Sequence, residues 1–150
     1  MTQQLRNLYL IWAGIILGVS LLATPAKFLA PDLSLTEALQ IGRVTFRVLA
    51  VTEAVLLTLA FVLVLLKPPV LRRSFLWPIV IAGVLFFQYA ILLPFLNFQT
   101  DQVMAGEAPG QSSALHSSYV AVELLKLGLL LLLGVRHSKR TEGLESSSRQ

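Results

Sequence analysis

The chain has 150 residues, of which 55% are hydrophobic and 13% are charged, and its formal net charge at pH 7 is +4. Soluble domains carry roughly a quarter of charged residues, so this composition excludes an ordinary water-soluble globule, a disordered protein and a coiled coil. The chain has no cysteine, which excludes disulfide scaffolds, iron–sulfur clusters and cysteine-ligated zinc.

Four apolar runs are each long enough to cross a bilayer, which takes about 20 residues of helix. With their flanking residues, the spans are expected at about 8–26, 35–66, 76–96 and 115–135. The first run meets Pro25, which we expect to end that helix because proline lacks a backbone N–H donor. The run also resembles a signal peptide, but its apolar part exceeds the usual length of about 7–15 residues. We therefore expect it to be retained as a span.

Local signals mark the ends of the later helices. Ser34 and Glu37 have the spacing of a capping box, which predicts a helix that begins at residue 35. Two successive prolines at 68–69 are expected to end it. Residues 97–113 contain glycine and proline and are expected to form a loop. The predicted fold class is all-α, a four-transmembrane-helix bundle.

The bundle is expected to occupy residues 1–137, and the polar segment 138–150 is expected to be a disordered cytoplasmic tail. Seven basic residues lie at one side of this bundle, namely Arg6, Lys67, Arg72, Arg73, Arg136, Lys139 and Arg140, whereas the first connection is mixed, with Lys27, Asp32, Glu37 and Arg43. Residues 97–113 contain two acidic residues and no Lys or Arg. The positive-inside rule therefore predicts cytoplasmic termini and an external 97–113 segment. We expect an integral protein of a bacterial cytoplasmic membrane, in contact with the lipid bilayer and with no nucleic-acid partner.

One polar residue in each expected span lies at a similar depth. Counted at about 1.5 Å per residue, Ser20, Glu53, Gln88 and Glu123 lie roughly 18–20 Å from the cytoplasmic boundary. Ionisable groups inside a membrane are costly and often mark ion or substrate pathways. We therefore expect a polar layer, slightly outside the midplane of the bilayer.

The fourth span carries a longer polar stripe. His116, Tyr119, Glu123 and Lys126 are spaced three, four and three residues apart, so they share one face of the helix. Glu123 and Lys126 form a favourable i,i+3 pair. Arg47 of the second span is expected to reach acceptors near the outer boundary. These include Glu53 of the same helix, which it would reach through an intermediate group. The candidate ligand- or ion-binding residues are Arg47, Glu53, Gln88, His116, Tyr119, Glu123 and Lys126.

Two further patterns concern packing. Trp12 and Trp77 lie near the cytoplasmic ends of their spans, where tryptophan is typical of an interfacial anchor. Gly14 and Gly18 have the small-xxx-small spacing that allows two helices to approach closely.

Signatures of catalysis and of cofactor binding are absent from the sequence. It has no Walker-type loop, no His-Glu-x-x-His motif and no nucleophile elbow. The two histidines lie at opposite ends of the expected bundle, which argues against haem. His116 and Met104 are the only candidates for copper on the outer side, so we expect no metal and no cofactor.

Several short patterns occur in order along the chain. They are Trp12-Ala-Gly14, Ala23-Thr-Pro25-Ala-Lys-Phe28, Gly42-Arg43-Val-Thr-Phe-Arg47, Leu93-Pro94 and Leu115-His116-Ser-Ser118. This order resembles a group of uncharacterised small four-helix integral membrane proteins, and more loosely the membrane domain of CopD-type copper-resistance proteins. The resemblance implies a four-helix membrane architecture and no established activity.

Three functions are compatible with these patterns. The polar layer is either structural, setting helix register, or binds or conducts a small polar species or ion. A membrane enzyme or redox protein acting on a lipid-soluble substrate such as a quinone would use His116, Tyr119 and Glu123 in acid–base chemistry. An accessory subunit of a larger membrane complex, or a homo-oligomer, would use its small-residue faces for packing.

Overall fold

The computed structural model describes residues 3–66, 75–106 and 112–135, which are helical apart from short connections and contain no strand. Four helical segments are long and apolar enough to cross a membrane, namely Gln3–Leu29, Leu35–Leu65, Leu76–Met104 and Ala114–Val135. The predictions of an all-helical fold and of four such segments are confirmed. The predicted double-proline stop and the predicted disordered tail lie outside the described residues.

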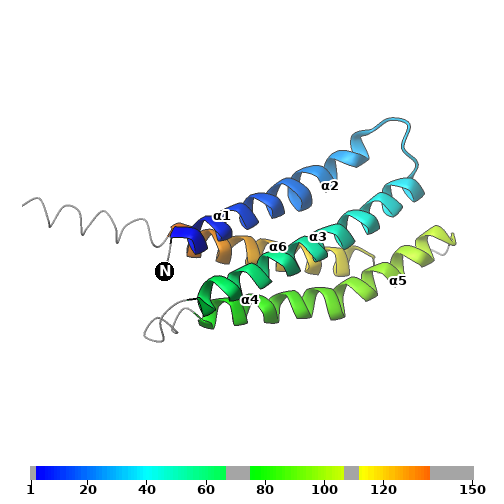
Figure 1. The fold of residues 1–150 in the computed structure, drawn as a ribbon. Helices are drawn as coiled ribbons and strands as arrows, with labels where there is room; N and C mark the ends of the chain where they lie inside the picture. Colours follow the sequence, from blue (N-terminus) through cyan, green and yellow to red (C-terminus); the bar gives the residue numbers. More distant parts are fainter. Residues whose placement is uncertain (1–2, 67–74, 107–111, 136–150) are drawn as a thin grey trace, which may run out of the picture.

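The four segments form an antiparallel bundle (Figure 1). In chain order the elements are α1 (Gln3–Ile16), η1 (Leu17–Ala23), α2 (Thr24–Ala26), η2 (Lys27–Leu29), α3 (Leu35–Leu65), α4 (Leu76–Phe86), η4 (Phe87–Leu92), α5 (Leu93–Met104) and α6 (Ser112–Val135). The start of α1 and the end of α6 lie at one end, which we call the amino end. The connection between η2 and α3 and the end of α5 lie at the opposite end, which we call the far end.

Two of the four segments change to π-helical winding just before a proline. The π-helix η1 precedes Pro25, and the π-helix η4 precedes Pro94. Proline lacks an N–H and its ring crowds the carbonyl four residues earlier, and a wider π turn lets the helix continue past this defect. The prediction that Pro25 ends the first helix is therefore wrong, because helical winding continues to Leu29. The third segment likewise runs through Pro94 to Met104, so the start predicted for the 97–113 loop is also wrong.

The predicted capping box is confirmed at the start of α3. The Ser34 hydroxyl accepts a hydrogen bond from the Glu37 backbone N–H, and the Glu37 carboxylate accepts one of 2.9 Å from the Ser34 backbone N–H. These bonds satisfy donors that the first helical turn leaves free. Both partners are set by local sequence, which is why the start of α3 could be predicted to the residue.

Two apolar clusters fill the interior. The larger one, which we call the amino-end cluster, is built from the buried residues Leu5, Tyr9, Trp12, Ala13, Ile16, Leu56, Ala60, Val64, Ile81, Leu85, Leu127, Leu130 and Leu133. The smaller one, the far-end cluster, consists of Phe46, Leu49, Leu92 and Tyr119. The polar layer lies between these two clusters, so each helix carries an apolar stretch on both sides of its polar residue.

One close approach of two helices involves a glycine that was not singled out in the sequence. Gly134 of α6 is buried, and a Cβ atom built there would lie 2.7 Å from Leu10 Cγ of α1. A Cβ atom at Gly14 or Gly18 would meet no neighbouring atom of the described chain within 4 Å. The predicted glycine motif therefore does not join helices within this part of the chain.

We expect Gly134→Val to destabilise the detergent-solubilised protein by about 1–3 kcal/mol, because the added side chain would push α1 and α6 apart. Gly14→Val is the matched control and should change stability by no more than about 0.5 kcal/mol. Thermal unfolding of both variants measures the difference. Equal effects would show that α1 and α6 are not in contact at Gly134.

Candidate functional site

A buried lysine lies at the centre of the polar layer. Lys126 of α6 places Nζ 2.8 Å from the Glu53 carboxylate of α3 and 3.3 Å from Oε2 of Glu123. The same ammonium donates a hydrogen bond of 2.9 Å to Oε1 of Gln88 in η4. All four side chains are at most 1% exposed. Three of the four residues predicted for the layer therefore meet around Lys126.

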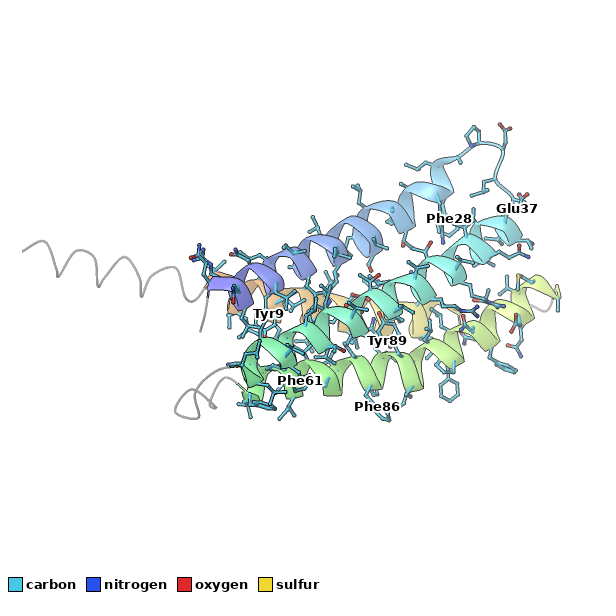
Figure 2. The ribbon with its side chains drawn as sticks, in the orientation of Figure 1. Tyr9, Phe28, Glu37, Phe61, Phe86 and Tyr89 are labelled. Carbon is cyan, nitrogen blue, oxygen red and sulfur yellow. The ribbon has the colours of Figure 1, made fainter. Side chains whose placement is uncertain are left out.

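Both carboxylate oxygens of Glu53 accept hydrogen bonds. Trp12 Nε1 donates a hydrogen bond of 2.8 Å to Oε1, the Tyr89 hydroxyl donates to Oε2, and the Lys126 ammonium provides the opposite charge. Tyr89 lies midway along the bundle (Figure 2). Three different helical segments thus supply donors to one carboxylate, which compensates its burial.

The sequence did not identify Trp12 and Tyr89 as members of this network. The prediction that Trp12 is an interfacial anchor is wrong, because its side chain is fully buried, whereas Trp77 is only partly buried. The first helix begins at Gln3, five residues before the apolar run. Trp12 therefore lies well inside the helix, where its indole meets Glu53, and not at the end of the span.

Ser20 lies outside the hydrogen-bond network. Its hydroxyl is buried in η1 and has no hydrogen-bond partner among the described residues. It lines a cavity of about 310 Å³ together with Tyr119 and Glu123. Ser20 therefore lies beside Glu123 but takes no part in the hydrogen-bond network of the other three residues, and its place in the layer stays a prediction.

Glu123 differs from Glu53 in one respect. Its Oε1 accepts a hydrogen bond of 2.6 Å from Gln88 Nε2, but Oε2 accepts none from the described residues, although Lys126 lies 3.3 Å away. The buried hydroxyl of Tyr119 also has no partner of acceptable geometry in the described part of the chain. The cavity that adjoins Glu123, Tyr119 and Ser20 is therefore lined by polar atoms that have hydrogen-bonding capacity to spare.

A second cavity of about 390 Å³ lies beside the first. The two share Thr24, Phe28, Phe46 and His116 as wall residues, and the second extends to Leu35, Leu39 and Val103 near the far end. Phe28 lies near that end (Figure 2). We call the two cavities together the far-end passage, and it ends at Glu123.

The outer part of this passage carries basic side chains. Arg43 donates hydrogen bonds to Asp101 at 2.6 Å and to the Asn97 carbonyl at 3.1 Å. Lys27 is partly buried, and its Nζ lies 5.0 Å from the centre of the Phe28 ring. Within residues 3–66, 75–106 and 112–135, no carboxylate forms an ion pair with Lys27.

Two further candidates lie away from the polar layer. Arg47 is exposed and has no contact with Glu53 in the described structure, because it follows the buried Phe46 on α3 and points outward. The prediction that Arg47 reaches this carboxylate is wrong. His116 is exposed as well, but it lines both cavities and so belongs to the passage.

No protein-family model, curated protein or solved structure matches this chain. The resemblance to small four-helix membrane proteins and to CopD-type proteins therefore stays a prediction. Function has to be inferred from the geometry of the site.

The charges of the layer do not balance. Two buried carboxylates, Glu53 and Glu123, share one ammonium, so the layer has one excess negative charge when both acids are ionised. An unpaired charge in a medium of low polarity is strongly unfavourable. Glu53 has three donors, so the excess falls on Glu123, which is then stabilised by a proton or by a bound cationic group.

Among the described residues there is no cluster of His, Cys, Asp and Glu that could hold a metal ion. What the site provides chemically is one carboxylate oxygen and two hydroxyl groups beside an enclosed space.

Proposed function

We propose that this chain is a small integral membrane protein whose helix bundle binds a small molecule with a cationic or hydrogen-bond-donating group at Glu123. The observation that carries the proposal is the position of Glu123, which lines a cavity and whose Oε2 lies 3.3 Å from Lys126 Nζ but accepts no hydrogen bond in the described chain. A purely structural layer would give both oxygens of each carboxylate a hydrogen-bond donor, as Glu53 has.

Binding is favoured over conduction by the position of the amino-end cluster. A transmembrane path would have to continue past Lys126 between Trp12, Ile16, Leu56 and Leu127, which are buried and apolar in that cluster. The far-end passage therefore meets closely packed side chains at the polar layer. A site with one entrance is typical of a binding pocket.

The surface supports a location in the membrane. Large apolar side chains are exposed along all four helices, among them Leu22, Leu66, Phe86 and Leu125. Phe86 points away from the bundle (Figure 2). Soluble monomers rarely expose apolar surface on this scale, and lipid would cover it. The basic residues in the sequence orient the amino end toward the cytoplasm, so the passage opens to the outside.

We expect n-butylammonium to bind the detergent-solubilised protein and Glu123→Gln to weaken that binding about tenfold or more, because the variant loses the charged acceptor. Isothermal titration calorimetry measures the affinity. The matched control is Asp32→Asn, which removes an exposed carboxylate outside both cavities and should bind as the wild type does.

Thermal unfolding should show that Glu123→Gln remains folded, since glutamine retains the contact with Gln88. Equal binding by wild type and Glu123→Gln, with the variant folded, would contradict the proposed site. Displacement of a copurified quinone by the amine would instead favour the enzyme or redox alternative, which uses the same space.

The proposed orientation leads to a separate prediction. We expect a cysteine at Ser112 to react with a membrane-impermeant thiol reagent added outside intact cells, and a cysteine at Ser146 to react only after lysis. The chain has no cysteine of its own, so each label has one target. The reverse labelling pattern would invert the orientation and place the passage on the cytoplasmic side.

A further inference from the structure

The far-end passage has groups of opposite charge at its two ends. At the inner end, Glu123 Oε2 is buried without a hydrogen-bond partner in the described chain. In the outer cavity, Lys27 is partly buried and forms no ion pair with a described carboxylate. Arg43 lines the same cavity, but Asp101 already neutralises it. A ligand that carries only a cationic group would satisfy the inner end and leave Lys27 unpaired.

The separation of the two ends follows from the first helix. Ser20 lines the inner cavity beside Glu123, and Lys27 lines the outer cavity seven residues later in the same helical segment. Seven residues of helix correspond to roughly 10 Å along the bundle. The walls between these levels are largely apolar and include Leu21, Phe28 and Phe46.

We propose that the far-end passage binds one molecule that carries both a cationic group and an anionic group, joined by an apolar spacer. The cationic group lies at Glu123, where Tyr119 and Ser20 can accept its remaining hydrogen bonds. The anionic group lies at Lys27, and the spacer lies along the apolar walls. This inference depends on the proposed binding at Glu123 and specifies the chemical class of the ligand.

Two sources can supply this chemistry. One is a free zwitterion that enters from the outside, and the other is a lipid headgroup such as phosphoethanolamine, whose short link requires the long Lys27 side chain to reach inward to the phosphate. In both cases the ammonium is the deeper group, because the carboxylate is at the closed end of the passage.

The test uses ω-amino alkanoic acids of increasing chain length, from glycine upward, titrated by calorimetry into the full-length protein in detergent. Alkylamines and alkyl carboxylates of matching length are the single-charge controls. We expect affinity to peak at an intermediate length, at which the ω-amino acid binds about tenfold or more tightly than the matching alkylamine. A paired charge at Lys27 accounts for that gain.

Two variants separate the ends. Lys27→Met should reduce binding of the best ω-amino acid about tenfold and leave binding of the matching alkylamine unchanged, whereas Glu123→Gln should weaken both. Arg47→Met is the matched control, since it removes an exposed basic residue that lines neither cavity, and it should change neither affinity. Thermal unfolding confirms that each variant is folded.

The outcomes are distinct. Alkylamine binding that depends on Glu123, with no effect of Lys27→Met on any ligand, would overturn this inference and leave the proposed function standing. If the wild-type protein bound neither the alkylamines nor the ω-amino acids, both this inference and the proposed function would be overturned. A lipid source is shown if nanodiscs of phosphatidylethanolamine abolish ω-amino acid binding and nanodiscs of phosphatidylglycerol do not, and a free zwitterion is shown if both allow it.

Discussion

Lys126→Met is expected to destabilise the detergent-solubilised bundle by about 3–5 kcal/mol, the range for breaking a buried ion pair from one side. The substitution removes the only ammonium within reach of Glu53 and Glu123 in the described structure, and leaves two buried carboxylates facing each other. Thermal or denaturant unfolding in detergent measures the loss. Methionine has a similar shape, so the effect reports mainly the charge.

Rescue experiments identify the partner of Lys126. Its nearer carboxylate is Glu53, at 2.8 Å, while Glu123 lies at 3.3 Å. We therefore expect Glu53→Gln to recover more of the loss in the Lys126→Met background than Glu123→Leu does. Replacing Glu123 would leave Glu53 charged and without a counter-ion, whereas glutamine at 53 can still accept a hydrogen bond from Trp12 and can donate one from its amide NH2 to the Tyr89 hydroxyl.

This expectation differs from the one that the sequence alone supports. The i,i+3 spacing suggested a closed pair of Glu123 and Lys126, for which Glu123→Leu would be the better rescue. If the stability changes of the single substitutions simply added in the double variants, Lys126 would not be coupled to either carboxylate. The buried polar layer would then be wrong, and with it the site at Glu123.

Trp12→Phe is expected to destabilise the solubilised bundle by about 2–3 kcal/mol, because it removes a hydrogen bond to a charged group that is fully buried. The indole Nε1 donates to Glu53 at 2.8 Å, and phenylalanine has no donor to replace it. Trp77→Phe is the matched control, since Trp77 is only partly buried and no hydrogen bond of its indole is found in the described structure. Unfolding in detergent measures both variants.

The chain has two tryptophans, so each of these variants carries a single tryptophan, whose emission can be excited selectively. The Trp77→Phe variant reports on Trp12 alone, and its emission should shift when Glu53→Gln is added, because the acceptor of the indole N–H changes. The prediction would be contradicted if Trp12→Phe and Trp77→Phe had equal effects on stability, which would place Trp12 at an ordinary interfacial position.

The polar layer combines two different kinds of carboxylate. Glu53 is held by donors from α1, η4 and α6, and its role is to join these helices. Glu123 shares Gln88 and Lys126 with that network, but its Oε2 accepts no hydrogen bond in the described chain, and the residue lines the cavity. In the proposed function, the first carboxylate fixes the helices and the second faces the ligand. Variants of Glu53 should therefore affect stability first, and variants of Glu123 binding first.

The two π turns also contribute to the site. Ser20 lies in η1, and Gln88 and Tyr89 lie in η4. A π turn shifts the angular position of the side chains that follow it, and such turns recur at functional sites. In both helices the π turn precedes a proline, Pro25 or Pro94. The prolines are visible in the sequence, but the rotation of the helix that accompanies them is seen only in the structure.

The sequence by itself determined the four apolar helices, the capping box at Ser34 and the identity of the buried charges. The apolar helices and the capping box depend on residues that are close together in the chain. The buried charges were found from the free-energy cost of placing a charged group among apolar residues, and each one can be located within a single apolar run. Glu53, Gln88, Glu123 and Lys126 were predicted from that cost, and the structure places all four together.

Only the tertiary structure decided which groups meet. Lys126 pairs with Glu53 across 73 residues, Trp12 and not Ser20 supplies the hydrogen bond from the first helix, and Arg47 is exposed. These outcomes depend on the axial shift and rotation of each helix relative to the others. Close packing between helices, such as that of Gly134 against the Leu10 side chain, sets this register. A depth count along separate helices contains no information about it. The lack of a hydrogen bond to Glu123 Oε2 in the described chain results from the same packing, because Trp12 and Tyr89 donate to Glu53.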